Sequence, residues 1–389
     1  MTTYASPRAH KRVTVGITLL WLLIHTFLWL DAGPRELYDS RLYAEAAQYL
    51  FQHGHPESWD QIFYIVPIFC IGLFETTFGA ATVPFIVFQS VISLFAALAL
   101  VKVVLNCTGR HVAGLVAGVI FLISIDNIQW NMTVMTESLF RSFVVFLLLA
   151  LSGFRGNMRG LVLIASLTGL VLMTRPAGAP IVGGVVVFLL RYYWMEGKLS
   201  RRQLSVIVAA VLVSGLVAAT VMLQAWDFTD QHKRGNIVTY MDVLEGSPGY
   251  YPSLREDVND VTFLDDSYPG IARVAHYFFW NPVHAFKVAG LKAWYLISGV
   301  RPYYSAYHNV YVALLYATMY ILGYVGIRRV GMAPISSFAI TVIVLNVLLV
   351  AISTVDWDNR FYIPMEPGIV VMAAIGLAEV IRGVSFQRD

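Results

Sequence analysis

The feature that most constrains the fold of this chain is a series of apolar segments that are long enough, or nearly so, to cross a lipid bilayer. They lie at 13–30, 82–105, 112–125, 134–151, 161–174, 177–191, 204–225, 309–327, 335–355 and 363–381. A helix needs roughly 20 apolar residues to cross the hydrocarbon core. Only 13% of the 389 residues are charged, whereas soluble domains average about 25%. We therefore predict an all-α polytopic membrane protein with about ten transmembrane helices.

The distribution of Lys and Arg predicts which ends of these segments face the cytoplasm, because short cytoplasmic loops are enriched in both residues. Two further apolar segments, 62–78 and 287–300, are ambiguous. If both stay on the far side as interfacial or re-entrant helices, fifteen of the 27 basic residues fall on the cytoplasmic side. If either crossed alone, the later basic loops would face outward. The sequence thus predicts that both termini are cytoplasmic.

Two long extracytoplasmic loops follow from this topology. The first covers 31–81 and is rich in acidic residues, and the second covers 226–308 and carries many tyrosines. Long loops are usually functional, and we expect interfacial helices in both. In the second loop, Lys287 and Lys292 lie in an apolar stretch that is typical of an interfacial amphipathic helix. Neither loop is large enough for a big independent domain, so we expect residues 1–389 to form one integral membrane domain.

Composition and motifs exclude several classes of function. A net charge of +3 is too small to indicate nucleic-acid binding, and no GxxxxGK nucleotide-binding loop is present. Cys70 and Cys107 form no CxxC pattern, and the histidines show no zinc-ligand spacing. We predict no nucleic-acid partner, no cofactor and no metal site; a divalent metal ion has no support in the sequence.

Charged residues inside or beside apolar segments are costly and often functional. In the first loop, Asp39 opens a predicted helix, where it can serve as the cap and place Tyr43 on the same face. Glu137 and Arg141 open the fourth apolar segment. They are four residues apart, so an ion pair within one helix is the simplest interpretation.

Two arginines stand where apolar segments meet the extracytoplasmic side. Arg175 precedes a proline and has no acidic residue near it in the sequence, so it either snorkels to the interface or binds an anion. Arg360 lies among aromatic residues that include Tyr362. It either pairs with an aspartate in an aromatic belt or binds a phosphate headgroup.

These polar clusters follow one another in a characteristic order. The residues are Asp39, Tyr43, Ala44 and Ala47; Tyr64–Pro67; Thr136, Glu137 and Leu139; Leu172, Arg175, Pro176 and Gly178; and Arg360, Tyr362, Pro364 and Pro367. This order resembles that of the GT-C glycosyltransferases, particularly the branch of protein O-mannosyltransferases and lipid A aminoarabinose transferases. The resemblance covers nearly the whole chain and is weakest over 203–355.

The resemblance implies an inverting glycosyltransferase that moves a sugar from a polyprenyl-phosphate donor to an extracytoplasmic acceptor. It implies Asp39 as the catalytic general base, Arg175 and Arg360 as ligands of the lipid phosphate, and Tyr43, Glu137 and Tyr362 as substrate-binding residues. Because the chain lacks the extra soluble domain of some protein-modifying relatives, a lipid or lipid-linked glycan is the expected acceptor, and a protein acceptor stays open.

Two points limit what is carried over. Many relatives have two adjacent acids in the first loop, whereas Ser40 follows Asp39 here, which argues against a metal ion at this position.

The alternative function is a polytopic transporter or lipid flippase without covalent chemistry, in which Glu137, Arg141 and Arg175 would line a pathway. No repeated halves of the kind found in many transporters are visible. In both cases membrane lipids surround the protein.

Overall fold

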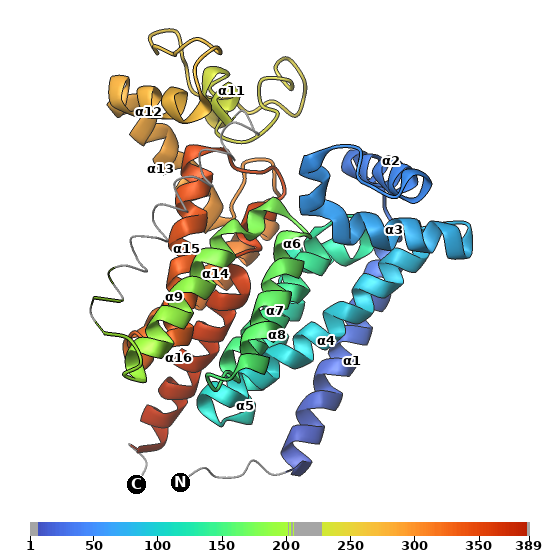
Figure 1. Cartoon of the computed structure of the whole chain (residues 1–389), viewed down its shortest axis with the longest axis vertical. Helices are drawn as coiled ribbons and strands as arrows, with labels where there is room; N and C mark the ends of the chain where they lie inside the picture. The colour runs from blue at the N-terminus through green and yellow to red at the C-terminus, as the bar shows by residue number, and fades with distance from the viewer. Residues whose placement is uncertain (1–6, 201, 204, 206–227, 387–389) are drawn as a thin grey trace. The chain divides into compact units, whose positions relative to one another are not determined.

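The structure is a computed structural model that describes residues 7–200, 202–203, 205 and 228–386. These residues fold into helices and loops without a β-strand (Figure 1), which confirms the all-α prediction. Extended segments pair only at isolated bridges, of which one joins Arg35 to Thr133. The predicted span 204–225 lies outside the described residues apart from Ser205.

The chain divides into two compact units. The first unit consists of Met1–Phe188, Thr318–Val342 and Ile363–Asp389, and the second consists of Leu189–Ala317 and Ile343–Tyr362. Three helices contribute residues to both units: α9 (Ala179–Met195), α14 (Ala306–Val330) and α15 (Pro334–Ile352).

Six of the described helical segments are long and apolar enough to cross a membrane. They are Arg8–Asp31, Trp59–Phe78, Thr82–Thr108, Pro176–Met195, Ala306–Val330 and Pro334–Ile352. Two further helical pieces, His111–Ile123 and Ile125–Met132, meet at Ser124 with a bend of 65°. If they are counted as one broken span, the structure has a seventh candidate. The chain is therefore a helical membrane protein, and the full count of about ten spans stays a prediction.

The ambiguous segment 62–78 is helical. It forms the 3₁₀ helix η1 (Trp59–Tyr64) and α3 (Ile65–Phe78). In Figure 1, α3 runs across α1 (Pro7–Asp31) and α4 (Thr82–Thr108) rather than alongside them. The direction of α3 is that of the predicted interfacial helix, whereas the 20 residues of Trp59–Phe78 are enough for a transmembrane span. How this segment lies in the bilayer therefore stays a prediction.

The core of the first unit explains why the first loop lies against the bundle. Helix α2 (Tyr38–His53) turns Ala46 and Ala47 inward, and these small side chains let it pack closely. The buried cluster that receives them comprises Ile68, Ile71, Phe85, Ile86, Met132, Val134 and Leu139. The acidic first loop therefore contains a helix, α2, that packs against a buried apolar cluster.

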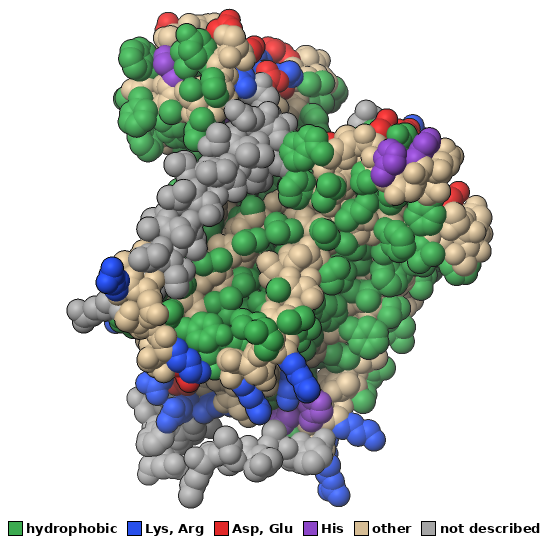
Figure 2. Space-filling model, viewed as in Figure 1, with side chains coloured by type: hydrophobic (Ala, Val, Ile, Leu, Met, Phe, Trp, Pro, Cys, Tyr) green, Lys and Arg blue, Asp and Glu red, His purple; other side chains and the backbone are tan. Residues whose placement is uncertain are grey.

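The two ends of the first unit differ in charge. Figure 2 shows Lys and Arg side chains gathered at the end where α1 begins and α16 ends. Helices α2 and α3 lie at the opposite end (Figure 1).

The remaining helices of the first unit follow α4 in the sequence or close the chain. They are α5 (His111–Ile123), α6 (Ile125–Ile128), the 3₁₀ helix η2 (Gln129–Met132), α7 (Glu137–Ser152), α8 (Met158–Leu172), the 3₁₀ helix η3 (Pro176–Gly178) and α16 (Glu366–Phe386). Close packing occurs where α14 meets α16. A Cβ atom on Gly376 would come within 1.9 Å of the carbonyl oxygen of Leu322, so only glycine allows this approach.

The second unit contains α11 (Phe228–Lys233), the 3₁₀ helix η4 (Pro252–Leu254), α12 (Gly270–Trp280), α13 (Pro282–Ser298) and the 3₁₀ helix η5 (Arg360–Tyr362). Side-chain hydrogen bonds join α13 and the residues after it to the segment that follows α15. Three of these bonds run from Lys292 Nζ to Ser353 O (2.6 Å), from Tyr303 Oη to Trp357 O (2.5 Å) and from Asn359 Nδ2 back to Gly299 O (2.9 Å). The loop that carries Arg360 is therefore fixed at several backbone points.

Candidate functional site

The start of α2 positions Asp39, though not as the predicted cap. Leu37 is the N-cap residue, and Asp39 lies half-buried in the first turn. The capping hydrogen bond comes from Ser40, whose Oγ accepts from Leu37 N at 2.9 Å and donates to Val134 O at 2.8 Å. The cap prediction for Asp39 is wrong, because its neighbour makes that bond; a carboxylate in the first turn is still favoured by the helix dipole.

Backbone hydrogen bonds join the first loop to two segments far along the chain. Arg35 N donates to Met132 O at 2.8 Å, and Val134 N donates back to Arg35 O at 3.0 Å. Val66 N donates to Met173 O at 3.1 Å. These bonds bring the residues before α2 to the segment that precedes Glu137, and the start of α3 to the segment that precedes Arg175.

Glu137 and Arg175 form a buried ion pair. Arg175 Nη1 lies 2.5 Å from Glu137 Oε1, and both side chains are buried. Pro176 disfavours helical geometry for the residue before it, and Arg175 accordingly has an extended backbone as the N-cap residue of η3. Glu137 is the first residue of α7, where a negative charge is favoured. The snorkelling interpretation of Arg175 is therefore wrong.

Tyr43 lies beside this ion pair. Burial and the nearby charge of Glu137 raise the pKa of Tyr43 well above its ordinary value; Asp39 adds to this effect and Arg175 opposes it. The ring of Tyr64 lies 5.6 Å from that of Tyr43, centroid to centroid. Four predicted residues, from the first loop and from the starts of α7 and η3, thus meet in the first unit.

Arg141 pairs with a residue that the sequence reasoning missed. Its Nε and Nη2 bind the two carboxylate oxygens of Glu366 at 2.6 and 2.7 Å, and Nη2 also donates to Phe121 O at 2.7 Å. The predicted pair within α7 is wrong, because Glu137 and Arg141 each reach a different segment. An available signal was Glu366 itself, a carboxylate that opens an apolar segment without a basic residue beside it.

Arg360 and Tyr362 belong to the second unit. Arg360 binds Asp356 with both Nε and Nη2 at 2.8 Å, as the aromatic-belt interpretation expects. Tyr362 is fully buried and stacks on Tyr316, with ring centroids 4.3 Å apart. A role for either residue in binding substrate stays a prediction.

Lys292 is buried rather than interfacial. Its Nζ donates to Ser353 O and lies 3.4 Å from His232 Nε2. Burial lowers the pKa of Lys292 to about 7. Lys287, on the same helix, is exposed and pairs with Glu256 at 2.6 Å. The prediction of two interfacial lysines is therefore wrong for Lys292, because helix packing turns it inward.

Replacing Lys292 by methionine is expected to remove a pH dependence of stability. The unfolded chain binds one proton more than the folded chain between pH 7 and the ordinary lysine pKa. The free energy of unfolding therefore rises with pH in this window, by at most about 1.4 kcal/mol per pH unit. Lys292→Met should be more stable than the wild type near pH 7 and should lose this slope.

Unfolding of purified protein at several pH values between about 7 and 9 measures both effects. Lys287→Met is the matched control, and we expect it to keep the wild-type slope because Lys287 is exposed. Parallel pH curves for the wild type and Lys292→Met would contradict the prediction.

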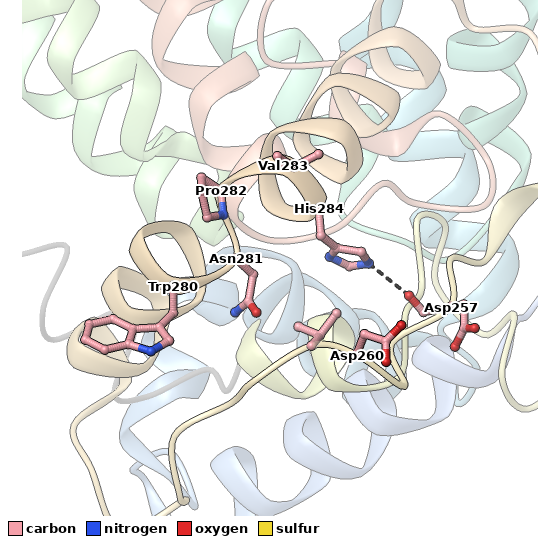
Figure 3. A pocket seen from close by; sticks show the side chains of 8 residues that line it. Asp257, Asp260, Trp280, Asn281, Pro282, Val283 and His284 are labelled. Carbon is pink, nitrogen blue, oxygen red and sulfur yellow. Dashed lines mark hydrogen bonds between the residues drawn. The ribbon is translucent and has the colours of Figure 1, made fainter.

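The second unit also contains a pocket of about 450 Å³ (Figure 3). Its lining residues are Asp257, Asp260, Val261, Trp280, Asn281, Pro282, Val283 and His284. Polar side chains that line the pocket form hydrogen bonds with other groups of the protein. His284 bonds Tyr277 Oη and lies 3.1 Å from Asp257 O, and Asn281 Nδ2 donates to Thr262 O at 2.8 Å. None of the predicted site residues lines this pocket.

Among the described residues, no three His, Cys, Asp or Glu side chains are grouped so as to hold a metal ion. Comparisons with protein-family models, curated proteins and solved structures find no match for this chain.

Proposed function

We propose that this protein is an inverting membrane glycosyltransferase that uses a polyprenyl-phosphate sugar and acts on an extracytoplasmic lipid or lipid-linked glycan. The observation that carries the proposal is the cluster of Asp39, Tyr43, Glu137 and Arg175. These residues come from distant segments and combine a carboxylate, a protonated phenol and a buried cation. Such a combination suits displacement of a phosphate by a hydroxyl group.

In the proposed reaction, the acceptor hydroxyl attacks the anomeric carbon of the donor sugar. Asp39 takes the hydroxyl proton as general base. The bond between the anomeric carbon and the phosphate oxygen breaks, and the lipid phosphate leaves with its electron pair. Because attack and departure occur on opposite faces, the configuration at the anomeric carbon inverts.

Arg175 supplies the positive charge that the leaving phosphate requires. A buried cation stabilises developing negative charge more strongly than a solvated one. Glu137 orients the guanidinium through the 2.5 Å ion pair. The hydroxyl of Tyr43, whose pKa lies above the ordinary tyrosine value, is protonated at neutral pH and can donate a hydrogen bond to the substrate.

The charge distribution of the first unit supports an extracytoplasmic site. Lys and Arg gather at the end where α1 begins and α16 ends, and α2, which bears Asp39 and Tyr43, lies at the other end (Figure 1, Figure 2). By the positive-inside rule, the basic end is cytoplasmic.

The test is a transfer assay with purified protein, radiolabelled polyprenyl-phosphate sugars and a total lipid and glycan extract. Formation of a labelled product supports the transferase, and its mass identifies the sugar and the acceptor. Movement of the labelled lipid across a liposome membrane without any product would instead favour a flippase.

Replacing Arg175 by glutamine is expected to lower kcat/KM for the donor by about 10²–10³-fold, by analogy with the loss of one group that stabilises a developing oxyanion. The single variant also leaves Glu137 buried without its cation. The double variant Glu137→Gln/Arg175→Gln removes both charges and serves as the control for stability.

If the double variant regains thermal stability but not transfer, Arg175 acts on the donor. Full transfer by the double variant would reduce Arg175 to a structural role. Arg360→Gln tests the second predicted phosphate ligand in the same assay, and unchanged donor affinity in both arginine variants would refute the phosphate-binding role.

A further inference from the structure

Helix α13 has two faces of unusual character. Its inward face buries Ala285, Val288, Lys292 and Leu296. Its outward face carries Val283, Phe286, Gly290, Trp294 and Ile297, which recur at intervals of three and four residues. We call these five residues the α13 stripe. Residues at this spacing share one side of a helix, and the exposed Lys287 lies on the same side.

The α13 stripe is strongly exposed. The exposed fractions are 85% for Val283, 69% for Phe286 and 61% for Trp294. A helix on a water-facing surface carries its charges outward and its apolar side chains inward. In α13 the outer face is apolar apart from Lys287, which pairs with Glu256, whereas Lys292 is fully buried on the inward face.

The next helix along the chain has the same outward character. Helix α14 is a candidate membrane span, and its first half exposes Tyr307 (90%), Val310 and Leu314. Exposed apolar side chains on a membrane span are the ones that contact lipid. Only residues 299–305 separate α13 from α14. The helix that carries the α13 stripe is therefore joined by a short loop to a helix whose exposed side faces lipid.

We propose that the α13 stripe contacts bilayer lipid, so that α13 lies in one leaflet with its apolar side against the acyl chains. A helix of 17 residues is about 25 Å long, which is shorter than the hydrocarbon core of about 30 Å. The helix therefore enters the bilayer without crossing it. Trp294 and the stem of Lys287 suit the interface between acyl chains and headgroups.

Lipid explains the stripe better than a second protein surface does. A soluble partner would have to cover Phe286 and Trp294 on a chain whose adjoining helix α14 already meets lipid. The buried position of Lys292 also matches a lipid environment, in which a charge is favoured inside the protein, where it is hydrogen-bonded. Lys292 meets this condition through Ser353 O.

The experiment places an environment-sensitive nitrobenzoxadiazole label on a cysteine at position 286. The background variant Cys70→Ser/Cys107→Ser removes the two native thiols. Phe286→Cys and Trp294→Cys report on the stripe, Tyr307→Cys on α14, and Asn259→Cys on an exposed polar loop of the same unit. Each labelled protein is reconstituted into nanodiscs with ordinary or brominated phosphatidylcholine.

We expect brominated lipid to quench the labels at 286, 294 and 307 at least twofold and to leave the label at 259 unchanged. Blue-shifted emission at 286 and 294 without quenching would mean that protein covers the stripe. Water-like emission at both positions would mean that nothing covers it. Either result, with quenching at 307, would overturn the proposal.

Discussion

Asp39→Asn is expected to lower sugar transfer by about 10²–10⁴-fold, the range that a general base contributes to catalysis. Asparagine has nearly the same shape as aspartate but cannot accept the proton of the acceptor hydroxyl. Asp39 is half-buried in the first turn of α2, where Leu37 is the N-cap residue and Ser40 accepts the capping hydrogen bond from Leu37 N. The substitution should therefore leave the helix in place. The measurement is the initial rate of product formation, together with donor binding, which should persist.

Glu45→Gln is the matched control for Asp39→Asn. Glu45 lies on the same helix but is exposed, so its loss should leave transfer near the wild-type rate. Full activity of Asp39→Asn would refute the role of Asp39 as base. Equal loss in both variants would show that the charge of α2 matters rather than one carboxylate.

Arg141→Ala is expected to cause the largest loss of stability of the substitutions considered, about 3–5 kcal/mol, because it leaves the buried carboxylate of Glu366 without a cation. It also removes the donor to Phe121 O in the last turn of α5 and the guanidinium that lies 3.6 Å above the Phe121 ring. Three helices, α5, α7 and α16, lose a shared contact. The measurement is unfolding in mild detergent titrated with a denaturing one.

The double variant Arg141→Met/Glu366→Leu should recover most of this loss, because it removes both charges and keeps apolar volume. Arg329→Ala is the control for an exposed pair. Arg329 lies 3.0 Å from Glu379, and its loss should cost at most about 1 kcal/mol. Equal losses in Arg141→Ala and Arg329→Ala would contradict the interpretation, as would a double variant no more stable than Arg141→Ala.

The two ion pairs of α7 have a common physical logic. Glu137 and Arg141 stand one helical turn apart, and each is neutralised by a residue from another helix end. A pairing within α7 would neutralise both charges but would not connect α7 to any other helix. The observed pairings connect α7 to the start of η3 and to the start of α16, and so hold the surroundings of Tyr43 and Arg175 in register.

Much of this arrangement was predictable from local properties of the chain. Hydropathy is a sum over neighbouring residues, so an all-helical membrane protein follows from the sequence directly. Polar residues at the ends of apolar segments are also visible without a structure, because their burial is costly wherever they lie. Glu137 and Arg175 are visible on that ground, whereas Asp39 and Tyr43 are indicated by a predicted helix in the first loop and by the resemblance; the four residues lie together.

The sequence by itself determined which residues are apolar, which charges are expensive and in what order they occur. Only the tertiary structure decided the partners of those charges. It pairs Glu137 with Arg175, turns Lys292 inward and brings Glu366 to Arg141. The physical reason is that an ion pair depends on the distance between side chains, and helices distant in the sequence set that distance when they pack.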